Sequence, residues 1–424
     1  MGAVTAHPDR PDRLDVYYGS ELVGTIHDTS PLSFEYAASW LERRERMMVA
    51  TIALQPGRSD SAAVQAFFEN LLPEGELRHY LAEQRKASTL FSLLLEVAGD
   101  TAGGFVIVPG GQHPEPAAYE VTAWETMAVA LGRKSASAID LQGRDARISL
   151  AGAQGKIGVA IFQDGLPRLP KGTSPSTHIL KPDIKHLAKV WHSAANETII
   201  MLAAANCGLP TAEAFYEPHT GSCVVRRFDR LVRPDGTLAR LVQYDLCQLA
   251  GTVSERKYEK EGGPGLATCA ALIRRYSTQP AVDLLHFVRW IFFNLYTGNN
   301  DSHAKNLSIC SRPGQGVTLT PFYDLMCTRL YPGLSQDFAF EIGGESRPAA
   351  MTSAHLAPLA RQLGMQPQFL ARQAADLARR VPDAMVQAVR DVKPALVPSA
   401  RILAERLQQF VLSTTKRLAA RFAR

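Results

Sequence analysis

The sequence lacks the features that mark membrane and secreted proteins. No apolar run approaches the roughly 18 residues that a helix needs to span a bilayer. The first residues have neither the apolar core of a signal peptide nor the pattern of a myristoylation site. Cysteine is scarce, with six in 424 residues, and none belongs to a Cys-x-x-Cys pair. We therefore expect a cytoplasmic protein with no membrane partner, whose cysteines are reduced core residues.

Charge is distributed unevenly along the chain. The net charge is +5, but residues 351–424 hold 12 Lys and Arg against 4 Asp and Glu, whereas the rest holds 34 against 37. A basic helical tail of this kind is either a solvated helix face or a surface that meets nucleic acid or an acidic partner. On the second interpretation, we hypothesise that Arg372, Arg379 and Arg380 lie near DNA.

Sequence patterns divide the chain into three predicted domains. These are a small N-terminal β/α subdomain (residues 1–110), a section of strands (111–244) and a mostly helical block (245–424). Strands with one helix, followed by helices, indicate an α+β layout with a cleft between two lobes. The elements expected in the first two domains are a hairpin over residues 14–26, helices over residues 61–72 (capped by Asp60), 89–97 and 196–207, and strands over residues 157–162, 177–181, 222–228 and 238–244.

The most informative stretch is a polar loop that follows an apolar helix expected over residues 284–296. Two short apolar runs within residues 307–320 flank a turn and should pair as a hairpin, which folds Asp324 back beside Asn306. Asp301 is then free to orient a hydroxyl and take its proton, while Asn306 and Asp324 offer hard oxygen ligands to magnesium. The Asp-x-x-x-x-Asn spacing is that of a kinase catalytic loop, and phosphoryl transfer requires little else.

This spacing alone also occurs by chance. The alternative is that Asp301 caps a helix and Asn306 lies in a turn. The preceding helix, the hairpin and the pair Tyr323-Asp324 together favour the catalytic interpretation.

The phosphate-binding end of the site is less standard. Residues 149–156 are small enough for backbone N–H groups to approach phosphate oxygens, but they match no Gly-rich loop motif and fit a small-residue turn as well. Lys181 ends an apolar strand and could reach the phosphates as a point charge. Glu197, on the following helix, either orients Lys181 or lies on the surface. Residues 224–228 would supply backbone groups and an aromatic ring to the adenine.

These residues together resemble the HipA family of bacterial toxin kinases over nearly the whole chain. The segments that carry the resemblance are residues 66–74 (AFFENLLPE), 148–156 (ISLAGAQGK), 171–181 (KGTSPSTHILK), 227–230 (RFDR), 257–265 (KYEKEGGPG), 300–306 (NDSHAKN) and 319–325 (LTPFYDL).

The resemblance implies a two-lobed protein-kinase-like fold, with a mixed β N-terminal lobe and an all-α C-terminal lobe. It implies an ATP- and Mg²⁺-dependent serine/threonine protein kinase that acts as the toxin of a type II toxin–antitoxin pair. The substrate implied is an aminoacyl-tRNA synthetase, of the glutamyl-tRNA synthetase type, and its inhibition causes growth arrest and persistence. The partner implied is a small helix-turn-helix antitoxin, with which the kinase represses its own operon on operator DNA.

By position, the resemblance also assigns roles to single residues. It makes Asp301 the catalytic base, and Asn306 and Asp324 the magnesium ligands. It makes Ser149 the site of autophosphorylation, where a dianionic phosphate would displace the loop and switch the kinase off. The residues implied in ATP binding are Ala151, Gly152, Ala153, Gln154, Gly155, Lys156, Lys181, Arg226, Arg227, Phe228, His303, Lys305, Asn306, Tyr323 and Asp324.

The chain departs from the family pattern in two places that matter. Gly155 stands where a Glu is usual, which should loosen the loop, and Arg226 replaces an acidic residue at the hinge. Two other functions stay open on this fold. One is a kinase of a small molecule or lipid; the other is a catalytically weak corepressor that keeps its antitoxin on DNA through the basic tail.

Overall fold

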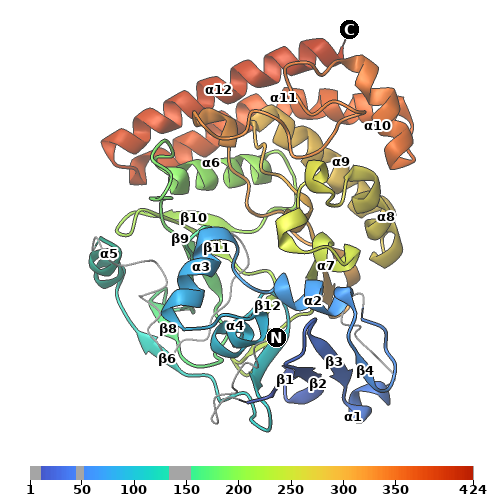
Figure 1. Ribbon diagram of the computed structural model, residues 1–424. Helices are drawn as coiled ribbons and strands as arrows, with labels where there is room; N and C mark the ends of the chain where they lie inside the picture. Colours follow the sequence, from blue (N-terminus) through green and yellow to red (C-terminus); the bar gives the residue numbers. More distant parts are fainter. Residues whose placement is uncertain (1–10, 44–51, 133–153, 424) are drawn as a thin grey trace.

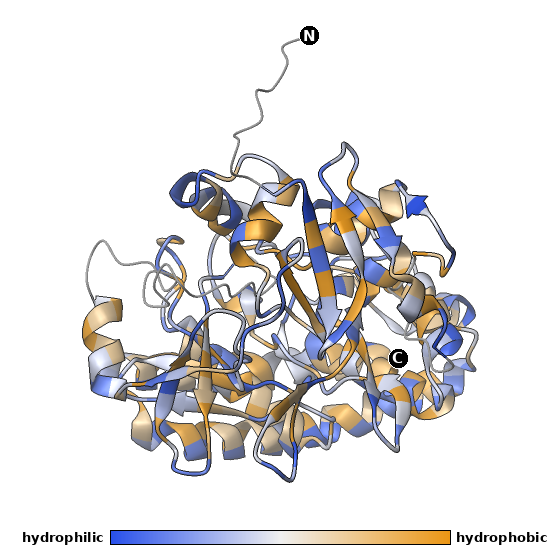
Figure 2. Cartoon of the chain, turned by 90° about the horizontal axis from the view of Figure 1, so that it is seen from below, coloured by the Kyte–Doolittle hydropathy of each residue, from blue (hydrophilic) through white to orange (hydrophobic). Residues whose placement is uncertain are grey.

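The computed structural model describes residues 11–43, 52–132 and 154–423 (Figure 1). Within these ranges the chain forms two mixed layers of strand and helix and a stack of long helices. Hydrophilic and hydrophobic bands alternate along many of the elements (Figure 2), as expected where one side of an element is buried.

An antiparallel sheet forms the core of the N-terminal unit, by which we mean the predicted subdomain of residues 1–110. Its strands lie in the order β4-β3-β2-β1-β5, and the predicted hairpin is its β1–β2 pair. Helix α2 covers this sheet, because Phe67 and Phe68 pack beside Phe34. The elements are β1 (Arg13–Tyr18), β2 (Glu21–His27), β3 (Ser33–Tyr36), α1 (Ala38–Leu41), β4 (Arg58–Ser59), α2 (Ala62–Glu69), α3 (Gly75–Gln84), α4 (Leu90–Val97) and β5 (Phe105–Pro109).

A second sheet has six strands, in the order β10-β11-β9-β7-β8-β6. The expected strand at Lys181 is β9, which lies between β11 and β7 in the middle of this sheet. The expected helix is α6, which packs against the long helix α11 (Pro367–Val392). The elements are β6 (Tyr119–Val121), α5 (Trp124–Gly132), β7 (Ile157–Ile161), β8 (Pro167–Pro170), β9 (His178–Lys181), α6 (Ser193–Asn206), β10 (Ala214–Glu217) and β11 (Ser222–Arg226).

The rest of the chain is mainly helical and includes one small sheet. The predicted hairpin is confirmed as β15 and β16, and β14 adds a third strand to it. In Figure 1 the longest helices, α11 and α12, lie side by side above α6. The elements are β12 (Arg230–Val232), β13 (Leu238–Arg240), β14 (Gln243–Asp245), α7 (Leu246–Ala250), α8 (Leu266–Tyr276), α9 (Pro280–Thr297), β15 (Ser308–Arg312), β16 (Gly316–Leu319), α10 (Leu356–Leu363), α11 (Pro367–Val392) and α12 (Pro398–Phe422).

Two local predictions are wrong. The cap of α2 is Ser61 rather than Asp60, since the Ser61 hydroxyl accepts a hydrogen bond from the Val64 amide. The strand expected over residues 238–244 is two strands: β13 pairs with β12, and β14 pairs with β15 in a different sheet. The local sequence fits a strand throughout, but the pairing partner changes at residues 241–242, and partners are set by tertiary contacts.

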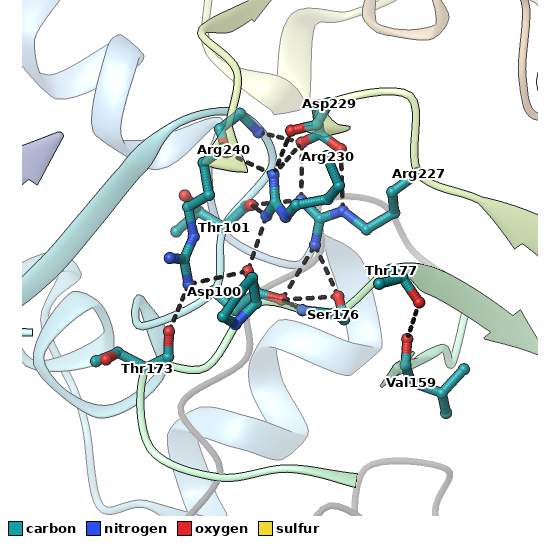
Figure 3. Close-up of polar contacts among 12 residues, drawn as sticks. Asp100, Thr101, Val159, Thr173, Ser176, Thr177, Arg227, Asp229, Arg230 and Arg240 are labelled. Carbon is teal, nitrogen blue, oxygen red and sulfur yellow. Dashed lines mark hydrogen bonds and ion pairs between the residues drawn. The ribbon is translucent and has the colours of Figure 1, made fainter. Parts of the chain in front are cut away.

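A buried ionic cluster joins the N-terminal unit to the second sheet (Figure 3). Asp100 is fully buried and accepts hydrogen bonds from Arg227 (3.1 Å), Arg230 (2.8 Å) and Ser176 (2.7 Å). Asp229 binds the same two arginines at 2.8 Å. Burial opposes ionisation of Asp100, but the arginines hold the pKa of this carboxyl well below its usual range. Removing one partner from such a cluster leaves an uncompensated buried charge, at a cost of about 3–5 kcal/mol.

All six cysteines are buried and none forms a disulfide, as expected. Within the described ranges, no helix combines the length and hydrophobicity needed to cross a bilayer.

Candidate active site

A cavity of about 520 Å³ lies where the three parts of the chain meet. The N-terminal unit contributes Asn70 and Glu74, the second sheet contributes Lys156 and Lys181, and the helical block contributes the loop around Asp301. The cavity therefore brings together residues that are more than 200 positions apart in sequence.

The loop that carries Asp301 begins where helix α9 ends at Gly298. This glycine has φ +74°, in the left-handed region, and a Cβ there would lie 2.8 Å from the ring of Phe410. Glycine is therefore the residue that both the backbone turn and the packing require. The predicted position of the loop, at the end of an apolar helix, is confirmed.

Asp301 lines the cavity, with 52% of its side chain exposed. The Tyr258 hydroxyl donates a hydrogen bond of 2.5 Å to its Oδ1 atom, and the Tyr258 ring lies edge-on to His303. Loss of bulk water around the carboxylate raises the pKa of Asp301, although Lys257 and the Tyr258 hydroxyl oppose this shift. The alternative of a helix-capping Asp301 finds no support, because the following 3₁₀ turn starts after His303.

Asn306 and Asp324 line the same cavity, as the hairpin prediction requires. The Asn306 amide nitrogen donates to the Asp301 carbonyl at 3.0 Å, which leaves the amide oxygen as the atom that can bind a metal. Asp324 has φ +56°, an uncommon conformation for a residue with a Cβ. Its carboxylate pairs with the Lys181 ammonium group.

Lys181 and Glu197 form a buried ion pair, with a distance of 2.5 Å between Nζ and Oε1. The interpretation of Glu197 as a surface residue is therefore wrong, since it is 1% exposed. Burial alone would lower the pKa of Lys181, but Asp324 and Glu197 raise it, so the ammonium form is stabilised. Burial also opposes ionisation of Asp324, yet Lys181 and Lys156 hold its pKa well below the usual range.

Lys156 adds a second buried cation near Asp324. Burial lowers the pKa of Lys156, and the Asp324 carboxylate partly offsets this effect. Two lysines around one carboxylate form a site that suits negatively charged oxygens, because the oxygens of a phosphate chain can contact both ammonium groups.

The side chains that line the cavity include oxygen atoms that could bind the predicted magnesium ion. Among the described residues, no three His, Cys, Asp or Glu side chains converge as a ready-made metal site. Magnesium, however, commonly takes one or two protein oxygens and completes its octahedron with substrate phosphates and water. One carboxylate from Asp324 and one amide oxygen from Asn306 fit this pattern.

The three residues predicted to lie beside the adenine differ in the contacts of their side chains. Arg226 is exposed and pairs with Glu213 at 2.9 Å, so its side chain lies at the cavity rim. The guanidinium group of Arg227 is paired with Asp100 and Asp229 in the buried cluster of Figure 3. Only the backbone and the aliphatic part of Arg227 could therefore contact a nucleotide. Phe228 and Tyr323 both line the cavity, with ring centroids 5.5 Å apart.

Lys305 lines the cavity, but its ammonium group has other partners. It donates to the carbonyl and side-chain oxygens of Asn70 at 2.9 and 2.7 Å and to Asp245 at 3.0 Å. In this structure the charge of Lys305 therefore holds other parts of the protein, which differs from the predicted role of binding ATP. Burial and Lys257 lower the pKa of His303 well below its ordinary value, which favours the neutral imidazole.

Part of the predicted phosphate loop falls outside the described residues: Ser149, Ala151, Gly152 and Ala153. Gln154 and Lys156 line the cavity on either side of Gly155, and the Gln154 amide donates to the Pro182 carbonyl at 3.1 Å.

The cavity residues that the sequence interpretation missed include Asn70, Glu74, Lys257 and Tyr258. All four lie in segments that carry the family resemblance, residues 66–74 and 257–265. Neither segment has a local pattern that indicates chemistry, because its residues meet the site through contacts that span 43 to 235 positions.

The arrangement can support transfer of a phosphoryl group to a hydroxyl. It brings two lysines, two potential oxygen ligands and an accessible carboxylate into one cavity. Cations neutralise the charge of a phosphate chain, and a carboxylate can accept a proton from the attacking hydroxyl.

Comparison with known sequence families gives two matches. The HipA N-terminal domain matches residues 14–108, and the HipA-like C-terminal domain matches residues 148–389. Together they cover the N-terminal unit and most of the remaining chain.

Individual relatives align over almost the full length. The protein Y4mE of Sinorhizobium fredii is 32% identical over 410 residues, which cover 92% of this chain and 94% of that protein. The serine/threonine-protein kinase toxin HipA of Shewanella oneidensis is 29% identical over 406 residues, 90% of each chain. A structure of HipA from Shewanella oneidensis, in complex with HipB and its operator DNA, superposes with a TM-score of 0.82 and 25% identity, covering 97% of this chain and 98% of that one.

Proposed function

The chain belongs to the HipA family, and on this premise we propose that it is an ATP- and Mg²⁺-dependent serine/threonine protein kinase. We further propose that it is the toxin of a type II toxin–antitoxin pair. The three predicted domains, residues 1–110, 111–244 and 245–424, are its N-terminal subdomain, N-terminal lobe and C-terminal lobe.

The observation that carries the proposal is the Lys181–Glu197–Asp324 arrangement in one cavity with Asp301. A kinase requires a lysine that is held by a glutamate and a carboxylate that can bind metal. Here Glu197 and Asp324 both contact the ammonium group of Lys181, so binding of a nucleotide would replace Asp324 by phosphate oxygens.

In the proposed reaction, Asp301 orients a serine or threonine hydroxyl and accepts its proton. The hydroxyl oxygen bonds to the γ-phosphorus as the bond from that phosphorus to the β–γ bridging oxygen breaks, and ADP leaves. Lys181 and Lys156 bind phosphate oxygens throughout. Magnesium, held by Asn306 and Asp324, supplies charge neutralisation at the phosphates.

The proposed substrate is an aminoacyl-tRNA synthetase of the glutamyl-tRNA synthetase type. Phosphorylation of such an enzyme would limit translation and cause growth arrest and persistence. The support is the family and the full-length similarity to a kinase toxin. No short sequence motif in a kinase encodes its protein substrate, because recognition surfaces are spread over both lobes.

We predict that Ser149 is phosphorylated when the full chain is incubated with Mg-ATP. Mass spectrometry of the wild type should show one added phosphate on the peptide that contains Ser149, and kinase activity should fall as this phosphate accumulates. The Ser149→Ala variant should stay active and unmodified at this site. A wild type that phosphorylates other proteins but never Ser149 contradicts the self-inactivation and leaves the kinase proposal intact.

The proposed partners are a helix-turn-helix antitoxin and, through it, operator DNA. The Shewanella oneidensis HipA structure contains HipB and operator DNA, which supports this proposal. In this chain, Arg379 and Arg380 lie on α11 with side chains 74% and 56% exposed, although both contact Asp376. A corepressor role through this surface is compatible with catalysis.

We expect replacement of Arg372, Arg379 and Arg380 by Ala to weaken the antitoxin–operator complex. For every DNA phosphate that the variant no longer binds, the salt dependence should also become shallower by about one unit of slope. Gel shifts over a salt series measure both effects. Arg347→Ala, an exposed arginine paired with Glu345, is the control. An unchanged shift with the triple variant contradicts the hypothesis that these arginines lie near DNA.

A further inference from the structure

The end of helix α2 enters the helical block and contacts its backbone. The Asn70 amide donates to the Thr252 carbonyl at 2.8 Å. Glu69 accepts hydrogen bonds from the Ser254 amide and hydroxyl at 2.8 and 2.6 Å. These residues are at most 4% exposed, apart from Thr252. We call residues 69–74 the brace, because they join two segments of the helical block.

The first segment joined by the brace is the catalytic loop. Lys305 donates to the carbonyl and the side-chain oxygen of Asn70 at 2.9 and 2.7 Å. Lys305 is 5% exposed, and Asn306, the proposed metal ligand, is the next residue. A buried ammonium group needs its partners in place, so Asn70 limits where the catalytic loop can lie.

The second segment is the loop that carries Tyr258. Glu74 forms an ion pair of 2.7 Å with Lys257, with side chains 7% and 15% exposed. Tyr258 is the next residue, and its hydroxyl binds the Asp301 carboxylate at 2.5 Å. The Asn70–Lys305 and Glu74–Lys257 contacts are thus each one residue away from a residue that is hydrogen-bonded to Asp301, Asn306 in the first case and Tyr258 in the second.

We infer that Asn70 and Glu74 are positioning residues of the active site: Asn70 holds the catalytic loop through Lys305, and Glu74 holds the Tyr258 loop through Lys257. The N-terminal unit is then part of the catalytic apparatus, with Asn70 and Glu74 acting through Lys305 and Lys257. The expected effect on catalysis rests on the proposed kinase function. The expected effect on the mobility of the two loops does not.

A purely structural role is the alternative, in which the brace attaches the N-terminal unit and nothing more. The two roles differ in what a broken contact changes. A displaced catalytic group lowers kcat steeply even when substrate still binds, because a misplacement of about 1 Å can cost about 100-fold. A loosened attachment lowers stability and leaves the kcat of the folded protein unchanged.

The test compares the full chain with the Asn70→Ala, Glu74→Ala and Glu74→Gln variants. Asp376→Ala is the matched control, since Asp376 forms a similar partly buried pair of 2.9 Å with Arg289, between α9 and α11. We expect Glu74→Ala to lower kcat about 10- to 100-fold with KM for ATP within about twofold. Glu74→Gln should retain most activity, because its amide oxygen still accepts from Lys257.

Hydrogen–deuterium exchange gives a readout that does not need kinase activity. Glu74→Ala should speed exchange of residues 252–260, and Asn70→Ala should speed exchange of residues 298–306, whereas Asp376→Ala should change neither. If the wild type transfers no phosphate, the kinase proposal fails and the exchange experiment still decides the inference.

Three results would overturn the inference. The first is unchanged exchange of both loops in both alanine variants. The second is a Glu74→Ala protein with the kcat of the wild type and only a lower Tm, as expected for Asp376→Ala. The third is an increase in kcat, which would make the brace inhibitory. If Asn70→Ala does not fold, the two Glu74 variants carry the test.

Discussion

The Asp301→Asn variant is expected to transfer phosphate about 100- to 10,000-fold more slowly than the wild type, with nearly unchanged affinity for ATP. The change is isosteric and removes the proton acceptor, and general base catalysis contributes a factor of this size. The side chain of Asp301 is 52% exposed in the cavity, whereas Lys181 pairs with Glu197 and Asp324, so we do not expect ATP binding to depend on Asp301. Kinetics with γ-labelled ATP and calorimetry of ATP binding measure the two quantities.

A matched carboxylate provides the control for this prediction. Asp235 lies in the exposed turn between β12 and β13, where it accepts hydrogen bonds from the Thr237 amide and hydroxyl, and Asp235→Asn should behave as the wild type. An Asp301→Asn protein with wild-type kcat would show that another group takes the proton. A decrease in ATP affinity as large as the decrease in kcat would place Asp301 at the nucleotide instead.

The Asp324→Asn variant is expected to transfer phosphate about 1000-fold or more slowly, and its ATP binding should no longer respond to magnesium. Asp324 is the carboxylate proposed to hold the metal, and a neutral amide neutralises much less of its charge. The change also removes the strongest counter-charge of Lys181 in the nucleotide-free state, which leaves Glu197 as its anionic partner. Metal-free ATP, which carries its own negative charge, should therefore bind at least as well as in the wild type.

Titrations of ATP with magnesium and with EDTA separate these effects. The wild type should bind Mg-ATP more tightly than metal-free ATP, and Asp324→Asn should show no such difference. If magnesium still strengthens ATP binding to Asp324→Asn, the metal is held by other residues, and the proposed assignment of Asp324 is wrong.

The chemistry of the site could be predicted from the sequence where it depends on short spacings. Asp301 and Asn306 are five residues apart, and a tight hairpin fixes the distance from Asn306 to Asp324. Lys181 ends a strand and Glu197 lies on the next helix, so their contact follows from neighbouring elements. In each case, local geometry leaves few alternatives.

Features that depend on distant partners could not be predicted. Arg227 follows a strand that lines the cavity, yet its charge is shared between Asp229, two residues away, and Asp100, 127 residues away. Lys305 lies beside a proposed metal ligand, yet its ammonium group donates to Asp245 and Asn70, 60 and 235 residues away. A buried charge takes whichever partners the packed fold provides, and sequence spacing does not show them. The division of residues 238–244 between two sheets has the same cause.

The central claim is that this chain transfers the γ-phosphate of ATP to a hydroxyl with Asp301 as base. Its most direct test follows label from γ-labelled ATP into protein, in the presence of a bacterial lysate, for the wild type and Asp301→Asn with magnesium or with EDTA. We predict labelled protein only for the wild type with magnesium. Equal labelling by the two proteins, or no labelling by either, would contradict the claim.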